Sequence, residues 1–301
     1  MTKPSTAKFH LPGLFEFYEL YRRFLPLLYE KRECFYPWAE IESIYGAPAG
    51  CLWGGGRTGF GDCDVNECLK LLAEYGISAR LTFSNSLLKE EHLSDYRCNN
   101  LCRKLAEKTA LRGGVIVHSD LLAEYLCKNY PQLYLVSSTT KVQTDLKDLK
   151  TELERSEFEY VVPDFRCNKA FDFLQSLPQS EKDKVEFLCN ECCSIACKDR
   201  RACYENVSRK ALGEDCPDHV CRAPGAEEGY KFSKAMKNPA FIGVTDITET
   251  YMPMGFSNFK IEGRSLGSAV VFEMLLYYLA KPEHHVELRE AVYLDSSLDL
   301  F

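Results

Sequence analysis

The feature that most constrains the fold is a regular alternation of short β-rich segments with amphipathic helical segments. Eight segments carry the strand pattern, and helical patterns such as NECLKLLAEYG and DLLAEYLCKNY lie between them. Strands that alternate with helices form parallel sheets, and eight such units favour closure into a barrel. The sequence therefore predicts an α/β fold, a (β/α)8 TIM-like barrel; the alternative is an open doubly wound sheet with a cysteine-rich insertion. The predicted strands are 41–45, 78–83, 114–117, 133–136, 160–163, 185–188, 240–243 and 258–261.

The alternation begins near residue 41 and divides the chain into two parts. Residues 1–40 are predicted to form an N-terminal helical extension, and residues 41–301 a single-domain barrel that includes a cysteine-rich segment at 189–221. Charges interrupt the apolar runs of the extension before a signal peptide or a membrane span could form. We therefore expect a cytoplasmic protein without a membrane partner.

The charge balance argues against nucleic acid as a partner. The 301 residues include 37 Lys and Arg against 44 Asp and Glu, which gives a formal net charge of -7. Such a chain offers no general basic surface for a phosphate backbone. A small-molecule substrate is the simpler expectation.

Fifteen cysteines, five of them in CNECCSIACKDRRAC at residues 189–203, require a specific explanation. Disulfides are disfavoured in the cytosol, where thiols stay reduced. A zinc site usually uses paired CxxC motifs, and in this segment only Cys189 and Cys192 have that spacing. An iron–sulfur cluster uses four thiolates with less regular spacing. Small buried thiols without any ligand are the remaining alternative.

Within this segment, Cys193 and Cys197 are four residues apart and would share one face of a helix, close enough to hold one ion or cluster. Other cysteines fit a structural role, because they lie within helical patterns beside leucines and are predicted to be core residues. These are Cys68, Cys102 and Cys127. Further candidate ligands are Cys189, Cys203, Cys216, Cys221 and Cys51.

Polar residues follow most of the predicted strands, at the end of a barrel where active sites form. The segment NFKIEGR is the sharpest example, because strand alternation directs Lys260 and Glu262 into the barrel interior, where an unpaired charge is costly. They form either a structural ion pair or part of a ligand site, and Arg264 offers a planar fork for a carboxylate or phosphate. We expect catalytic roles for Lys260, Glu262 and His118, and binding of an anionic small molecule by Arg57, Lys141, Arg264 and Asn85.

The stretch MKNPAFIGVTDITETYMPMGFSNFKIEGR resembles the segment that identifies the collagenase-like peptidase family, and the CxxxC of Cys193 and Cys197 is similar to its cysteine pattern. The resemblance spans residues 40–280. It implies a TIM-like barrel with a [4Fe-4S] cluster on four cysteines, here Cys193 and Cys197 completed by Cys189 and by one of Cys216 and Cys221, of which we take Cys221. The family's peptidase label is historical. The resemblance also implies oxygen-independent hydroxylation, of ubiquinone precursors or RNA bases with prephenate as oxygen donor, so RNA is not excluded as a partner.

The leading hypothesis is an anaerobic iron–sulfur oxidoreductase or hydroxylase-like enzyme acting on an anionic small molecule. Two alternatives stay open. A zinc-dependent hydrolase or peptidase would use Glu191 or Glu262 as base, although the chain lacks HExxH. A non-catalytic cluster-bearing protein would act beside a second barrel subunit, because members of this family can act in pairs.

Overall fold

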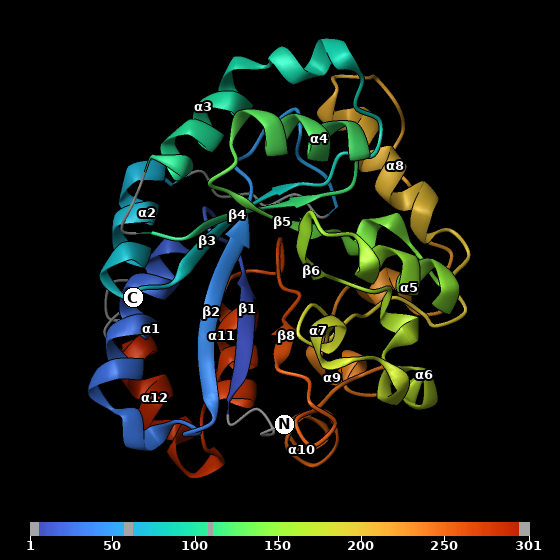
Figure 1. Ribbon diagram of the computed structural model, residues 1–301. Helices are drawn as coiled ribbons and strands as arrows, with labels where there is room; N and C mark the ends of the chain where they lie inside the picture. Colours follow the sequence, from blue (N-terminus) through green and yellow to red (C-terminus); the bar gives the residue numbers. More distant parts are fainter. Residues whose placement is uncertain (1–5, 57–62, 108–110, 295–301) are drawn as a thin grey trace.

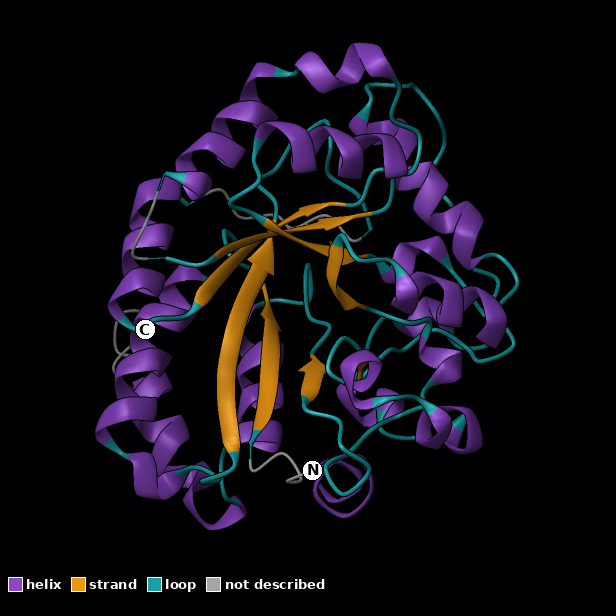
Figure 2. Ribbon diagram, in the orientation of Figure 1, coloured by secondary structure: helices purple, strands orange, loops and turns teal. Residues whose placement is uncertain are grey.

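The computed structural model describes residues 6–56, 63–107 and 111–294. Eight parallel strands form a nearly closed barrel, and helices lie around it (Figures 1 and 2). The strand order is β6-β5-β4-β3-β2-β1-β8-β7, and a bridge between Val161 and Val185 brings β6 to β7. The predicted (β/α)8 barrel is confirmed. The strands are β1 (Ala7–Pro12), β2 (Ala39–Gly46), β3 (Ser78–Phe83), β4 (Gly113–Val117), β5 (Tyr134–Ser137), β6 (Phe158–Val161), β7 (Glu186–Leu188) and β8 (Asn258–Lys260).

Helices connect the strands and cover the outside of the barrel. Several begin at side-chain caps; the carboxylate of Asp64, for example, accepts hydrogen bonds from the backbone amides of Asn66 and Glu67. None of the helices in the described ranges combines the length and hydrophobicity needed to span a bilayer. The helices are α1 (Tyr18–Glu30), α2 (Val65–Glu74), α3 (Tyr96–Ala106), α4 (Asp120–Asn129), α5 (Leu146–Glu154), α6 (Phe171–Ser176), α7 (Gln179–Lys182), α8 (Arg200–Ala211), α9 (Phe232–Ala235), α10 (Val244–Asp246), α11 (Ser268–Leu279) and α12 (His285–Arg289).

One predicted strand is wrong and one strand was missed. Residues 240–243 are apolar and mostly buried, as in a strand, but they form no ladder with a neighbouring strand of the described chain. The amide of Ile242 donates one hydrogen bond to the carbonyl of Cys189. The missing strand is β1, which pairs with β2 and β8 and so completes the ring. It lies inside the segment predicted as a helical extension, so that prediction is wrong for residues 7–12, although α1 follows. Lys8, His10 and Pro12 make this segment look unlike a buried strand.

The barrel separates two layers of buried side chains. The larger layer fills the space between strands and helices and includes Phe9, Phe83 and Phe259. The smaller layer fills the barrel interior and consists of Tyr45, Ile116, Val136, Tyr160, Val162 and Leu188. Because side chains alternate along a strand, polar residues that share the parity of the interior layer also point inward.

Candidate functional site at the carboxyl ends of the strands

Charged side chains are buried in the barrel interior beneath the strand ends. Glu186 of β7 accepts hydrogen bonds from Nη1 of Arg80 at 2.5 Å and from Nζ of Lys260 at 2.8 Å. Nε2 of His10 lies 3.5 Å from the same carboxylate. Burial alone would raise the pKa of Glu186, but Arg80, His10 and Lys260 lower it well below the usual value. Burial lowers the pKa of both Lys260 and His10. The cluster is held together by one carboxylate.

This cluster answers the question left open for Lys260. Its partner is Glu186, a residue that the sequence analysis did not single out, whereas Glu262 lies farther along, at the mouth of the barrel. Nζ of Lys260 also lies 3.8 Å from the ring centre of Tyr45, a cation–π contact. The sequence contained one indication of the roles of Arg80 and Glu186: each is a charged residue inside an otherwise apolar strand segment.

A small cavity lies at the mouth of the barrel. It has a volume of about 20 Å³, enough for one water molecule. Lys260, Glu262 and Arg264 line it on one side. Within the described part of the chain, Nε of Arg264 and Oγ1 of Thr82 are buried without a hydrogen-bond partner. In most proteins a buried polar atom has a protein, water or ligand partner, so these two atoms mark a place where a ligand could bind. The other lining residues are Tyr45, Gly56, Ser84, Ile116, Ser138, Thr139, Thr140, Val162 and Tyr204.

A glycine-rich loop, residues 54–56, closes over this mouth. A Cβ atom on Gly55 would lie 2.3 Å from backbone atoms of Ser84, and one on Gly56 would lie 2.9 Å from Nη2 of Arg264. The loop therefore needs glycine to approach the strand ends this closely. Arg57, the next residue and a predicted substrate ligand, lies outside the described residues.

A second cavity, of about 790 Å³, adjoins the mouth, and five cysteines line it. Gly56 and Tyr204 line both cavities, so the two spaces are neighbours. The cysteines come from three segments: the loop after β7, the first turn of α8, and the loop before α9. They are Cys192, Cys193, Cys197, Cys203 and Cys221. All fifteen cysteines of the chain are thiols rather than disulfides in the structure.

A buried ion-pair network holds the cysteine loop. Oε1 of Glu191 accepts hydrogen bonds from the amides of Cys192 and Cys193, at 2.9 and 3.1 Å. Its other oxygen lies 2.8 Å from Nη1 of Arg200, the first residue of α8. Arg200 is only 2% exposed and also lies 3.4 Å from Asp164. Glu191 therefore fixes the loop, which makes it a poor candidate for the general base of a hydrolase.

The spacing of the donors in this cavity does not suit a single metal ion. A tetrahedral zinc site with Zn–S bonds of about 2.3 Å places its sulfur ligands roughly 4 Å apart. Among the described residues, no three ligand atoms around this cavity lie within 4.8 Å of one another. A ready-made mononuclear site is therefore not present in the described cavity wall.

The structure brings together three of the four predicted metal ligands. Cys193, Cys197 and Cys221 line the cavity, and Cys203 and Cys192 join them. Cys189 does not line it: this side chain is fully buried on the outer face of the barrel, where burial raises the pKa of its thiol. Its place among core residues makes it a packing thiol.

The other cysteine candidates lie elsewhere. Sγ of Cys216 accepts a contact from Nδ2 of Asn206 at 3.6 Å, outside the cavity wall. Sγ of Cys51 lies 3.1 Å from Sγ of Cys98, and both are buried. Of the three predicted core cysteines, Cys68 and Cys102 are buried. The prediction is wrong for Cys127, which is exposed because it lies on the solvent side of α4.

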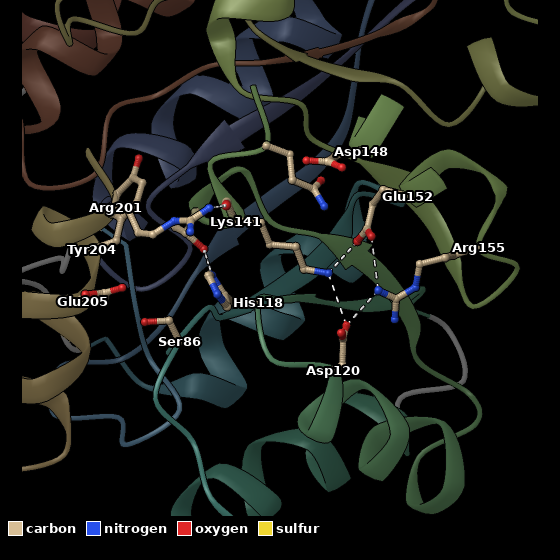
Figure 3. Close-up of a pocket in the computed structure, with 12 residues that line it drawn as sticks. Ser86, His118, Asp120, Lys141, Asp148, Glu152, Arg155, Arg201, Tyr204 and Glu205 are labelled. Atoms are coloured by element: carbon tan, nitrogen blue, oxygen red, sulfur yellow. Dashed lines mark hydrogen bonds and ion pairs between the residues drawn. The ribbon is translucent and has the colours of Figure 1, made fainter. Parts of the chain in front are cut away.

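A polar pocket of about 440 Å³ adjoins the mouth on its other side and contains two of the predicted site residues (Figure 3). Nζ of Lys141 lies 2.6 Å from Glu152 and 3.4 Å from Asp120. Arg155 contacts the same two carboxylates. These ion pairs neutralise Lys141, so the pocket does not by itself attract an anion. It is lined by Ser86, His118, Asp120, Thr140, Lys141, Gln143, Asp148, Glu152, Arg155, Arg201, Tyr204 and Glu205.

His118 lies in this pocket, where its Nδ1 is 2.9 Å from Oγ1 of Thr140 (Figure 3). Burial, with Lys141 and Arg201 nearby, lowers the pKa of His118 to about 4. The imidazole is therefore neutral at pH 7 and is a weak base. The predicted substrate ligand Asn85 is used differently, because its amide nitrogen donates to the carbonyls of Leu52 and Ser208.

The pH dependence of stability is expected to report on His118. Its folded pKa lies below the unfolded value of about 6.5, so its contribution is complete above that pH and is lost as the pH falls toward the folded pKa. Between pH 7 and pH 5 the loss is about 2 kcal/mol. Urea unfolding at the two pH values should show a smaller loss in His118→Asn than in the natural protein. Equal losses in both would contradict the burial of a neutral histidine.

Comparisons with known proteins extend only to the fold. No family model matches the sequence, and no curated protein is similar to it. The structure is similar to a solved one described as "The Structure of the U32 Peptidase Mk0906", with a TM-score of 0.52 and 14% sequence identity. The similarity covers 87% of this chain and 95% of that chain. That protein is a U32 peptidase, of the collagenase-like type that the sequence resembles; at this identity the likeness concerns the barrel.

Proposed function

We propose that this protein is an iron–sulfur barrel enzyme, with a [4Fe-4S] cluster in the cysteine-lined cavity and redox chemistry on an anionic small molecule at the adjoining mouth. The observation that carries the proposal is the convergence of five cysteines from three segments on one cavity beside the strand ends. Barrel enzymes place their reactive groups at this end.

The donor set fits such a cluster. A [4Fe-4S] cluster is held by four thiolates, and a body of several irons holds its ligands farther apart than one ion does. We assign Cys193, Cys197, Cys203 and Cys221, with Cys203 in place of the buried Cys189. The zinc-hydrolase alternative is disfavoured, because three donors close enough for one ion are missing from the described cavity wall and Glu191 is engaged with the loop and Arg200.

The surrounding residues complement this assignment. When bound, a cluster supplies one-electron transfer, while the protein sets its environment. Arg200 lines the same cavity, and its positive charge interacts with Cys193. Burial disfavours the charge of Arg200, but Glu191 and the neighbouring Tyr204 and Cys193 raise the pKa of Arg200 well above its usual value. A permanently charged guanidinium offsets the negative charge of thiolates nearby.

The substrate is proposed to bind at the mouth, between Arg264 and Tyr204. Nε of Arg264 and Oγ1 of Thr82 are both buried and have no hydrogen-bond partner in the described chain, so both are available to a substrate. Because this cavity holds only about one water molecule, substrate entry requires the glycine loop or Tyr204 to move. His118, neutral and close by, is the proposed hydrogen-bonding group for the reacting substrate, and Glu262 and Lys260 complete the polar wall.

Arg264→Met is expected to weaken binding of an anion at the mouth without changing the iron content. A charge-assisted hydrogen bond contributes about 1.5–3 kcal/mol, or roughly tenfold to a hundredfold in affinity. Calorimetric titration with inorganic phosphate measures the change. Arg155→Met is the matched control, since this arginine is already paired with Asp120 and Glu152 in the neighbouring pocket. Equal affinities in the natural protein and Arg264→Met, or a loss of iron, would assign Arg264 to the structure instead.

The proposal as a whole is tested by the iron, sulfide and zinc contents and the visible spectrum of protein purified without oxygen. About four irons and four sulfides per chain would support it. One zinc in the cysteine cavity and no colour would favour the hydrolase alternative, and an absence of all metal would leave these cysteines as free thiols that line a cavity. The cysteine variants that localise the cluster are treated in the Discussion.

A further inference from the structure

Three potential metal ligands converge at the amino-terminal end of the barrel, away from the cysteine-lined cavity. Cys34 lies just before β2, His284 lies after α11, and Glu287 lies in α12. Their ligand atoms all lie within 4.8 Å of one another, the only such trio of Cys, His, Asp and Glu in the described ranges. Figure 1 shows α12 beside α1, near the start of β2.

The two distances to Oε2 of Glu287 are close to those of a tetrahedral site. With bonds of about 2.1 Å to nitrogen and oxygen and 2.3 Å to sulfur, a tetrahedral zinc ion separates N from O by about 3.4 Å and S from O by about 3.6 Å. In the structure, Nδ1 of His284 lies 3.3 Å from Oε2 of Glu287. Sγ of Cys34 lies 3.9 Å from the same oxygen. Little movement is needed to place all three around one ion.

Neighbouring contacts orient the ligands. Nζ of Lys31 lies 2.7 Å from Oε1 of Glu287, so this oxygen is engaged and Oε2 is the one that faces Cys34 and His284. The carbonyl of Cys34 accepts a hydrogen bond from the amide of Lys281. Such outer contacts fix the direction of a metal ligand.

We propose that Cys34, His284 and Glu287 bind one zinc ion, with water as the fourth ligand. A thiolate and an imidazole select zinc over magnesium or calcium, which prefer oxygen ligands. The ion would join the segment before β2 to the segment after α11. Because the amino-terminal face of a barrel serves stability, we assign the site a structural role. The inference does not depend on the proposed iron–sulfur function.

The site is tested by counting zinc bound to the full chain after treatment with a chelator and dialysis against zinc. His284→Ala and Glu287→Gln are each expected to bind one zinc fewer per chain than the natural protein. His285→Ala is the matched control, because this neighbouring histidine contacts the carbonyl of Ala280 instead of the trio. Equal zinc contents in the natural protein and His284→Ala would overturn the proposal.

A second measurement separates this site from the cysteine-lined cavity, which could also take up zinc. Cys193→Ala should bind one zinc more per chain than the double variant Cys193→Ala/His284→Ala. Zinc should also raise the thermal unfolding midpoint of the natural protein and of His285→Ala, but not of His284→Ala. If the difference disappears in the Cys193→Ala background, the zinc belongs to the cavity and the trio is only a hydrogen-bonded cluster.

Discussion

Cys193→Ala protein, purified without oxygen, is expected to lack the iron–sulfur cluster that we propose for the natural protein. Cys193 lies on the loop after β7 and lines the cavity, and its amide is fixed by Glu191. Cys193 would supply one of the four thiolates that such a cluster requires, and its loss would leave too few ligands to retain the iron. Iron and sulfide are expected to fall from about four each per chain to near zero, with loss of the visible absorption.

Matched cysteine variants make this result specific. Cys127→Ala removes an exposed thiol of α4, and Cys68→Ala a buried thiol outside the cavity; both should retain full iron. Cys189→Ala tests which cysteine is the fourth ligand. The sequence predicted Cys189, whereas the structure buries Cys189 away from the cavity, so this variant should keep its iron. Full iron in Cys193→Ala, or equal loss in Cys127→Ala, would contradict the assignment. Loss of iron in Cys189→Ala but not in Cys203→Ala would restore Cys189 as a ligand.

Strand periodicity was sufficient to predict the barrel, because seven of its strands have continuous apolar runs or clear alternation. It failed for β1, where Lys8 and His10 interrupt the pattern. His10 is inside because Glu186 stands 3.5 Å from it, a partner that is distant in sequence. Hydrophobic periodicity depends only on residues that are close in sequence, so it cannot predict a buried partner that is distant in sequence.

The parity of strand positions explains both the success with Lys260 and the failure with Cys189. Lys260 points into the barrel and Glu262, two residues on, reaches the mouth cavity, as alternation predicted. In β7, Glu186 and Leu188 point inward, so Phe187 and the following Cys189 point outward. The outward parity of Cys189 could be derived from the sequence. The prediction instead relied on the position of Cys189 at the end of a strand, where barrel enzymes place their reactive groups. The loop cysteines Cys203 and Cys221 follow no such rule, and only the folded loop brings them together.

Glu186→Gln is expected to cause the largest loss of stability of any conservative change in the barrel interior. The carboxylate faces Arg80 and Lys260, and all three side chains are buried. Removing one partner of a buried ion pair leaves an uncompensated charge and costs about 3–5 kcal/mol. Urea unfolding at pH 7 measures the loss. Glu159→Gln is the matched control: Glu159 pairs with the half-exposed Arg112, so its loss should be below about 1 kcal/mol.

The size of the Glu186→Gln effect also tests how the interior accommodates charge. The lowered folded pKa of Glu186 means that its contribution is complete above its unfolded pKa and is lost as the pH falls. Burial already lowers the pKa of Lys260, so without Glu186 the lysine can release its proton, whereas Arg80 cannot. A loss near about 3 kcal/mol would therefore indicate that Lys260 is neutral in Glu186→Gln. In that case the double variant Glu186→Gln/Lys260→Met should be no less stable than Glu186→Gln. A loss no larger than that of Glu159→Gln would show that the cluster does not depend on its single carboxylate.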